Sequence, residues 1–81
     1  MLENVKDGFV KEVLLSPTID KFNLADVLRK VGGLCSKDLE NGEIPFEVVE
    51  KRKDFWFAAS DSYRQGDYPK CREHLINYFS V

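Results

Sequence analysis

The sequence has little of what marks membrane-spanning or secreted proteins. Its 81 residues contain no apolar run of the roughly eighteen residues that a spanning helix needs, so we expect no membrane segment. The first residues lack the basic region and apolar stretch of a secretory signal, and we therefore expect a cytoplasmic protein. Only two cysteines are present, Cys35 and Cys71, and they form neither a CxxC motif nor a dense disulfide framework. In a reducing compartment we expect both to be free thiols.

The sequence also lacks an excess of charge of either sign. Twelve lysines and arginines stand against fourteen aspartates and glutamates, which gives a net charge of −2. Nucleic acids and anionic lipids attract proteins with a surplus of basic residues. The basic run Lys51-Arg52-Lys53 is flanked by Glu50 and Asp54, which cancel most of its field, so we read it as a solvated surface. We expect neither nucleic acid nor a membrane as a partner, and we keep a nucleic-acid-associated accessory role as the first alternative function.

Motifs that carry catalysis are missing as well. No phosphate-binding glycine loop, Ser-His-Asp pattern or paired-carboxylate motif occurs. The single histidine, His74, follows Cys71 by about one helical turn, a spacing that can supply two metal ligands or a thiol beside a base. A zinc site would need further ligands, and Cys35 is the other thiol. We predict no enzyme activity, no cofactor, no metal and no small-molecule substrate, with a small cofactor-free enzyme using Cys71 and His74 as the second alternative.

What the sequence does contain is apolar residues at helical spacing along most of the chain. This pattern predicts an all-α fold, a single helical domain over residues 1–81 built as a small bundle of four to five helices. The first helix is expected from about Glu3 to Leu15. Gly8 weakens its start, so that a regular helix is expected from Phe9 onward.

Glycine and proline predict the next boundaries. Ser16-Pro17 ends the first helix and can open the second, although Asn23 is a later candidate N-cap. Gly32-Gly33 is expected to stop the second helix because glycine readily adopts the left-handed conformation of a C-cap. Asn41-Gly42 then ends a short helix over residues 34–40.

The last two helices carry the clearest signals. Residues 46–65 follow Pro45 without a further glycine or proline, which predicts the longest helix, with apolar groups on two sides. Asp67 is the expected N-cap of the final helix, with Pro69 in its first turn. We expect these helices to fold back on each other as a C-terminal antiparallel hairpin. The buried face of the final helix is predicted to consist of Cys71, Leu75, Tyr78 and Phe79.

Residues 54–79 combine a small residue in one helix, a glycine turn and a small residue in the next helix. These are Ala59, the turn Tyr63-Arg64-Gln65-Gly66-Asp67-Tyr68, and Cys71 in place of an alanine. The segment resembles one helical hairpin of the tetratricopeptide-repeat family. Tyr78 departs from the family pattern, which has alanine there. The resemblance covers about a third of the chain, and no second repeat is visible, whereas a stable array needs about three.

The resemblance implies protein binding on the inner face of the first helix of the hairpin. Carried onto this sequence, that face consists of Lys53, Trp56, Ser60, Tyr63 and Arg64. Tryptophan and tyrosine are frequent binding anchors, and the basic residues beside them could meet an acidic group. The alternative for Trp56 is a core position, packed on Phe9, Phe22 or Val27.

We therefore predict a small protein–protein interaction module that acts as an adaptor, an inhibitor or an assembly subunit. Its expected partner is another protein or a second copy of the chain. Self-association would be favourable because a chain of this size has a thin core and gains from burying a further face.

Overall fold

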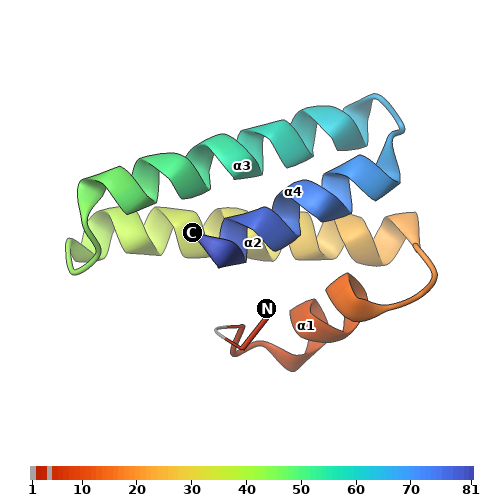
Figure 1. The fold of residues 1–81 in the computed structure, drawn as a ribbon, viewed down its shortest axis with the longest axis horizontal. Coiled ribbons are helices and arrows are strands. Elements are labelled where there is room, and N and C mark those ends of the chain that lie inside the picture. Colours follow the sequence, from red (N-terminus) through yellow and green to blue (C-terminus); the bar gives the residue numbers. More distant parts are fainter. Residues whose placement is uncertain (1, 4) are drawn as a thin grey trace.

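The protein is all-helical in the computed structural model, which describes residues 2, 3 and 5–81. Four helices follow one another along the chain (Figure 1): α1 (Gly8–Leu15), α2 (Lys21–Asn41), α3 (Phe46–Arg64) and α4 (Tyr68–Ser80). No strand occurs within the described residues. The prediction of an all-α fold of four to five helices is confirmed. None of the described helices is long and apolar enough to cross a membrane.

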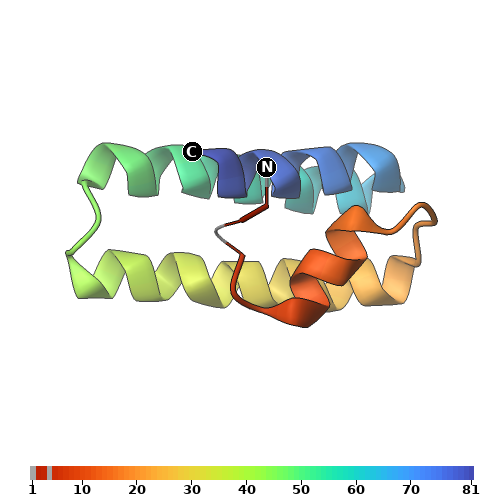
Figure 2. The ribbon, with the colours of Figure 1, turned by 60° about the horizontal axis from the view of Figure 1, so that its bottom comes forward.

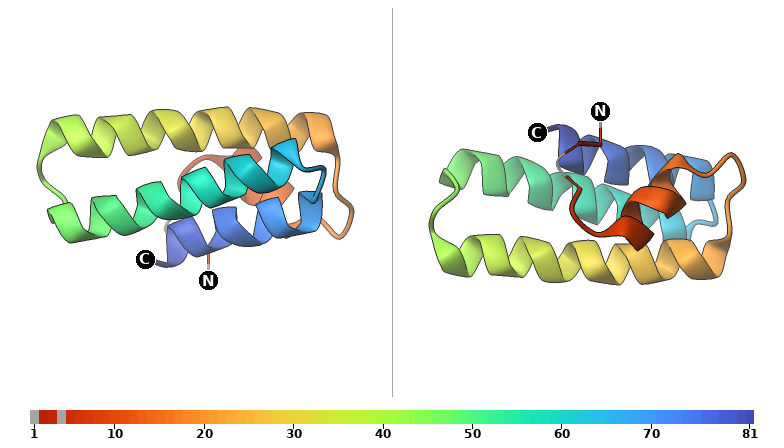
Figure 3. Two further views of the ribbon diagram at one scale, coloured as in Figure 1. Left: turned by 90° about the horizontal axis from the view of Figure 1, so that it is seen from above. Right: turned by 90° about the horizontal axis from the view of Figure 1, so that it is seen from below.

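The helices surround one core. α3 and α4 lie next to each other, α2 lies opposite them, and the short α1 crosses a remaining side (Figures 2 and 3). α1 packs against α2 and α4 but not against α3. The largest fully buried side chains come from α1, α2 and α4: Val10, Leu24, Val27, Val31, Cys71, Leu75 and Tyr78. α2 and α3 also share an outer side, where the residues that line a hollow all belong to these two helices.

An aspartate fixes the start of α1. Oδ1 of Asp7 accepts hydrogen bonds from the backbone amides of Phe9 at 2.9 Å and Val10 at 3.3 Å. These bonds satisfy amides that have no partner inside the helix. The start at Glu3 is therefore wrong, whereas the regular helix predicted from Phe9 onward agrees within one residue, because α1 begins at Gly8, directly after its cap.

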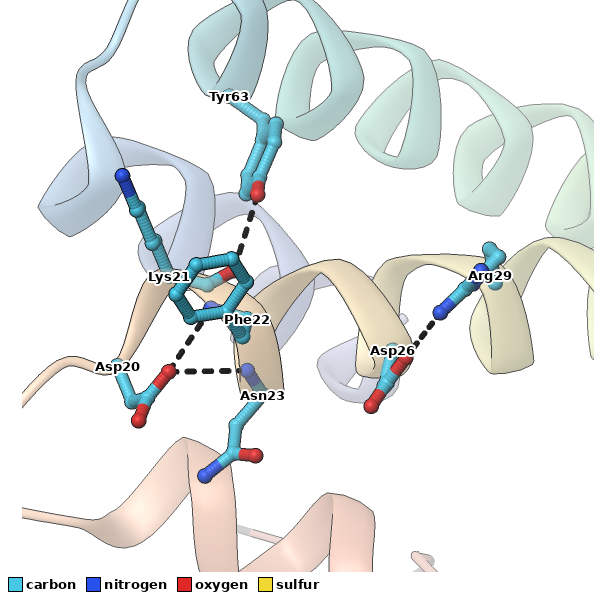
Figure 4. A network of polar contacts seen from close by, with 7 residues as sticks. All are labelled: Asp20, Lys21, Phe22, Asn23, Asp26, Arg29 and Tyr63. Atoms are coloured by element: carbon cyan, nitrogen blue, oxygen red, sulfur yellow. Dashed lines mark hydrogen bonds and ion pairs between the residues drawn. The ribbon is translucent and has the colours of Figure 1, made fainter.

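A second aspartate fixes the start of α2. Oδ1 of Asp20 accepts hydrogen bonds from the backbone amides of Phe22 at 2.8 Å and Asn23 at 3.2 Å (Figure 4). Both predicted starts, Ser16-Pro17 and Asn23, are wrong. Ser16 does end α1, as predicted, but it does not open α2. Asn23 already lies in the first turn and donates its amide to the cap.

α2 continues through Gly32-Gly33, and the predicted helix stop at this pair is wrong. The separate short helix expected over residues 34–40 is the C-terminal half of α2. A β-carbon on Gly32 would lie only 3.0 Å from Cζ2 and 3.1 Å from Cε2 of Trp56, so this glycine allows α3 to approach closely. The packing outweighs the helix-propensity cost of about 1 kcal/mol per glycine. Gly42, with φ of 69°, ends α2 as the Asn41-Gly42 signal predicts.

α3 and α4 follow their sequence signals closely. α3 begins directly after Pro45, and α4 begins after Asp67, whose Oδ1 accepts a hydrogen bond from the Lys70 amide at 3.3 Å. Gly66 supplies the left-handed conformation of the turn between them, with φ of 79°. The four residues predicted for the buried face of α4, Cys71, Leu75, Tyr78 and Phe79, are all buried.

Candidate functional site

Two of the residues predicted to bind a partner, Trp56 and Tyr63, contact α2. Nε1 of the half-buried Trp56 donates a hydrogen bond to the carbonyl oxygen of Leu28 at 2.7 Å. The hydroxyl of Tyr63 donates to the carbonyl oxygen of Lys21 at 3.0 Å (Figure 4). Each ring thus buries an apolar body and satisfies its polar tip. The two bonds fix the position of α3 along α2.

Trp56 is intermediate between the two positions considered for it. It packs against the core and closely approaches Gly32, yet part of the side chain stays accessible. Phe22, one of the core partners considered for it, is itself 71% exposed. Trp56 therefore lies at the edge of the core, where a second protein can still touch it.

The other three residues of the predicted binding face, Lys53, Ser60 and Arg64, lie along the same helix. Nζ of Lys53 is 3.6 Å from a carboxylate oxygen of Glu50, and Arg64 pairs with Asp61. Both basic residues are exposed and Ser60 is half-buried. Exposed pairs one turn apart stabilise a helix by only a few tenths of a kcal/mol, so a partner's carboxylate could replace them at small cost.

An apolar groove of about 430 Å³ runs between α2 and α3 beside Trp56. Its α2 wall consists of short side chains between two longer ones: Arg29, Gly32, Gly33, Cys35, Ser36 and Leu39. Its α3 wall consists of Val49, Lys53, Trp56 and Phe57. We call this surface the α2/α3 groove. It brings together Lys53 and Trp56 of the predicted face, whereas Ser60, Tyr63 and Arg64 do not line it.

Large apolar side chains at the α2/α3 groove are exposed. Leu39 is 60% exposed and Phe57 is 52% exposed. The Phe57 ring meets the Trp56 ring edge-on, with centroids 5.2 Å apart. A neighbouring hollow shares Leu39 and Val49 with the groove and extends it to Phe46, which is 67% exposed; the acidic residues Asp38 and Glu43 also line this extension. Contiguous exposed apolar surface of this kind is typical of a protein-interaction site.

The two charged side chains that line the α2/α3 groove are both basic. Arg29 pairs with Asp26, and Lys53 pairs with Glu50, each within its own helix. Burial raises the pKa of the half-buried Cys35 thiol, so the thiol stays protonated and adds no negative charge. The groove therefore offers an apolar strip with positive groups at its sides.

A partly buried ion pair joins the two walls of the groove from inside. Nη1 of Arg52 lies 3.2 Å from Oδ2 of Asp38, and the two side chains are 21% and 24% exposed. The Arg52 guanidinium also lies 5.8 Å from the centre of the Tyr78 ring. The interpretation of Lys51-Arg52-Lys53 as a solvated surface is thus wrong for Arg52, although both lysines are exposed. A guanidinium can link α3, α2 and α4 because it is planar and stacks on aromatic rings.

Cys71 and His74, the residues considered for an enzyme, do not form an open site. Cys71 is fully buried, and burial raises the pKa of its thiol to about 11. At neutral pH it is therefore a thiol and not the nucleophilic thiolate. His74 is half-buried, and its Nδ1 has no hydrogen-bond partner among the described residues. Within the same residues, no group of three or more histidine, cysteine or acidic side chains could hold a metal ion.

Sequence reasoning, through the tetratricopeptide-repeat resemblance, placed Lys53 and Trp56 on one face of α3, and both residues line the α3 wall of the groove. It missed the α2 wall because the expected stop at Gly32-Gly33 divided that helix. In a continuous helix, Gly32, Ser36 and Leu39 have the i, i+4, i+7 spacing of one face. That spacing was the available signal.

Comparison of the chain with protein-family models, with curated proteins and with solved structures gives no match.

Proposed function

We propose that the protein is a non-catalytic protein–protein interaction module, an adaptor, inhibitor or assembly subunit, whose α2/α3 groove binds an amphipathic helix of a partner protein. The observation that carries the proposal is the exposure of Leu39 and Phe57 beside Trp56, on the outer side that α2 and α3 share. Large apolar side chains in such a position gain free energy when a partner removes them from water.

A helix suits the shape of this surface. Two neighbouring helices leave a furrow between them, and the ridge of a third helix packs into such a furrow. The small residues Gly32, Gly33 and Ser36 allow a backbone to come close. Apolar anchors at i, i+3 or i+4, and i+7 of the partner would then lie against Leu39 and Phe57.

The charges select the kind of helix. Arg29 and Lys53 line the groove beside Trp56, and among the described residues the carboxylates Asp38 and Glu43 line only its extension toward Phe46. A partner helix with glutamates or aspartates beside its apolar stripe would meet these cations, whereas a lysine-flanked helix would be repelled. We therefore assign the partner as an apolar helix with acidic flanks.

The α2/α3 groove overlaps only in part with the surface that the tetratricopeptide-repeat resemblance implies. We propose that α3 and α4 act as an antiparallel hairpin of that kind, with its inner face directed partly to α2. The hydrogen bonds of Trp56 and Tyr63 to α2 support this assignment. A foreign helix would then bind beside α2, touch Lys53 and Trp56, and reach Ser60 and Arg64 only if it extends along α3.

A synthetic helix can test the proposal directly. The probe is an amphipathic peptide of about five turns, with leucine on one face and glutamate on its flanks, compared with the same peptide carrying lysine flanks. Trp56 is the only tryptophan, so its fluorescence reports binding at the groove. We expect saturable binding of the glutamate peptide and affinity at least about tenfold lower for the lysine peptide, a difference of roughly 1.4 kcal/mol.

A matched pair of variants locates the binding surface. The double substitution Leu39→Gln with Phe57→Gln should weaken binding of the glutamate peptide about tenfold or more. Leu15→Gln with Phe22→Gln changes the same two residue types at positions that are also exposed but do not line the groove, and it should leave binding unchanged. Equal loss in both variants would contradict the assignment. A dimer that only the groove variant dissociates, measured by sedimentation, would identify a second copy as the occupant instead.

A further inference from the structure

A second hollow lies on the other flank of α2. It has a volume of about 400 Å³ and is bounded by the segment before α1, by α1 and α2, and by the end of α4. This volume falls in the range of roughly 300–1,000 Å³ that is typical of small-molecule sites. Among the residues that the structure describes, Gly33 alone lines both this hollow and the α2/α3 groove. The two surfaces can therefore be altered separately.

The floor of the second hollow is apolar. Val10 is fully buried, Val5 and Phe79 are 9% exposed, and Leu34 is 40% exposed. A β-carbon on Gly33 would meet no atom within 4 Å, so this edge of the hollow is open. An alkyl chain lying on these residues would be removed from water along much of its length, which is favourable for each methylene group.

The rim of the second hollow is positively charged. Lys6, Lys30 and Lys37 line it together with one carboxylate, Asp7. Nζ of Lys30 lies 3.1 Å from Oδ2 of Asp7, so these two charges compensate each other. Among the described residues, no carboxylate pairs with Lys6 or Lys37. Two uncompensated cations thus stand above an apolar floor in a chain whose net charge is −2.

The positions on α2 explain how the helix builds this surface. Lys30, Leu34 and Lys37 are spaced i, i+4, i+7 and therefore share one face. The arrangement puts a positive group on either side of an exposed leucine. We call the hollow with its Lys6, Lys30 and Lys37 rim the lysine-rimmed hollow.

We propose that the lysine-rimmed hollow binds an amphipathic organic anion, an alkyl chain that ends in a carboxylate, as in a medium-chain fatty acid. The chain lies on Val5, Leu34 and Phe79. The carboxylate lies at the ammonium groups of Lys37 and Lys6. A lysine ammonium suits such a ligand because it is a compact point charge on a flexible stem that can follow the carboxylate. The ligand is bound and not converted, so the proposal adds no catalytic step and is independent of the groove.

Three simple amphiphiles test the chemistry. Dodecanoate below its micelle concentration should bind with 1:1 stoichiometry and shift the backbone NMR signals of Gly33, Leu34, Lys37 and Phe79. Dodecyltrimethylammonium has the same chain with the opposite charge, and acetate has the same charge without the chain. Both should bind at least about tenfold more weakly, because each lacks one of the two interactions. Equal binding of the cationic amphiphile, or shifts that never saturate, would overturn the proposal.

Matched variants locate the ligand. Lys37→Glu should weaken dodecanoate binding about tenfold or more, whereas Lys70→Glu makes the same charge change on α4, outside the hollow, and should not. Leu34→Gln should weaken binding, whereas Leu39→Gln changes the other exposed leucine of α2, at the groove, and should not. Circular dichroism shows whether each variant is folded, and all four positions are exposed. Binding that Lys70→Glu weakens as much as Lys37→Glu would contradict the assignment.

An alkyl anion could also be presented by a membrane. Vesicles containing phosphatidylglycerol are therefore compared with monomeric dodecanoate. Binding of the dissolved ligand that depends on Lys37 supports the proposal. Binding only to vesicles, with no saturable binding of dodecanoate, would overturn it in favour of a membrane contact.

Discussion

The two flanks of α2 have similar exposed apolar side chains, but they differ in whether their basic side chains are paired with carboxylates. Each flank has an exposed leucine, Leu39 at the α2/α3 groove and Leu34 at the lysine-rimmed hollow. The cations of the groove already pair with carboxylates on their own helices, whereas Lys6 and Lys37 at the hollow have no such partner among the described residues. An uncompensated cation gains more from a dissolved anion than a paired one does. Charge pairing, more than apolar area, thus distinguishes the surface that we propose for a protein from the surface that we propose for a small anion.

The two flanks of α2 also differ in shape: the groove is elongated, and the hollow is bounded on several sides. The groove extends along two long helices toward Phe46, as an elongated partner requires. The hollow is closed on one side by the segment before α1 and on another by the end of α4. We therefore propose a short alkyl chain for the hollow, which is bounded by several elements, and an elongated helix for the groove between two helices.

The largest effect that we expect is a difference in reactivity between the thiol at the groove, Cys35, and the thiol in the core, Cys71. Cys35 is half-buried and lines the groove, whereas Cys71 is fully buried. We expect Cys35 to react with a thiol reagent such as dithiobis(nitrobenzoate) about a thousandfold faster than Cys71, because Cys71 becomes accessible only when the domain opens. Stopped-flow absorbance of the variants Cys35→Ser and Cys71→Ala measures each rate. The glutamate peptide should protect Cys35, and dodecanoate should not; similar rates for both thiols would contradict the structure.

The buried thiol of Cys71 also predicts that the free energy of unfolding falls at alkaline pH. Burial raises the pKa of Cys71 from the ordinary 9.0 to about 11, so the folded state disfavours the thiolate. The contribution of the neutral thiol to the free energy of unfolding is complete below pH 9. It is lost as the pH rises toward 11. Urea denaturation of the parent chain and of Cys71→Ala across this range should show a pH dependence that the variant reduces.

A smaller effect, on the free energy of unfolding, is expected from alanine substitutions at the two neighbouring glycines of α2. Gly33→Ala should raise the free energy of unfolding by about 1 kcal/mol, because its β-carbon meets open space and alanine favours the helix. Gly32→Ala should lower it by about 1–2 kcal/mol, because the new methyl group would press on the Trp56 ring at 3.0 Å. The ring cannot easily retreat, since its Nε1 is bonded to the carbonyl oxygen of Leu28. Chemical denaturation measures both; equal stabilisation by the two alanines would show that Trp56 moves freely.

Gly32 and Gly33 also illustrate that local sequence signals do not determine every helix boundary. Local signals fixed the boundaries of α3 and α4, because Pro45, Gly66 and Asp67 act within one turn of the positions they control. Gly32-Gly33 has the same local signal as a helix stop, but its outcome is decided by Trp56, which lies far away in the sequence. Close packing of a distant ring cannot be read from the spacing of neighbours.

The candidate sites likewise have parts that one helix predicts and parts that depend on residues far apart in the sequence. The repeat resemblance predicted the face that carries Lys53 and Trp56, because that face belongs to one helix. The groove and the hollow need two or more elements, and their exposed leucines look like core residues in the sequence. The cap Asp20 escaped prediction because Ser16 and Asn23, on either side of it, are equally good N-caps. Asp7 escaped prediction because the helical spacing was expected to begin before it, at about Glu3.

The smallest expected effect tests the charge argument at the hollow itself. The hydrogen bond from Lys30 and those from the α1 backbone hold the pKa of Asp7 below its ordinary value of 3.8. The contribution of this carboxylate to the stability of α1 is therefore complete at neutral pH and is lost as the pH falls below that value. Asp7→Asn keeps a good N-cap but removes the charge that compensates Lys30. We expect it to tighten dodecanoate binding about threefold at neutral pH, a change of the size that exposed charges produce.

Asp20→Asn is the matched control for this last experiment. It makes the same exchange at the N-cap of α2 and changes the net charge of the chain equally, but Asp20 does not line the hollow. Calorimetric titration of both variants with dodecanoate separates the two explanations. If Asp20→Asn tightens binding as much as Asp7→Asn, the anion responds to the overall charge of the protein. If only Asp7→Asn does so, the compensation of Lys30 at the rim controls what the lysine-rimmed hollow can hold, and the contrast between the two flanks of α2 rests on individual charges.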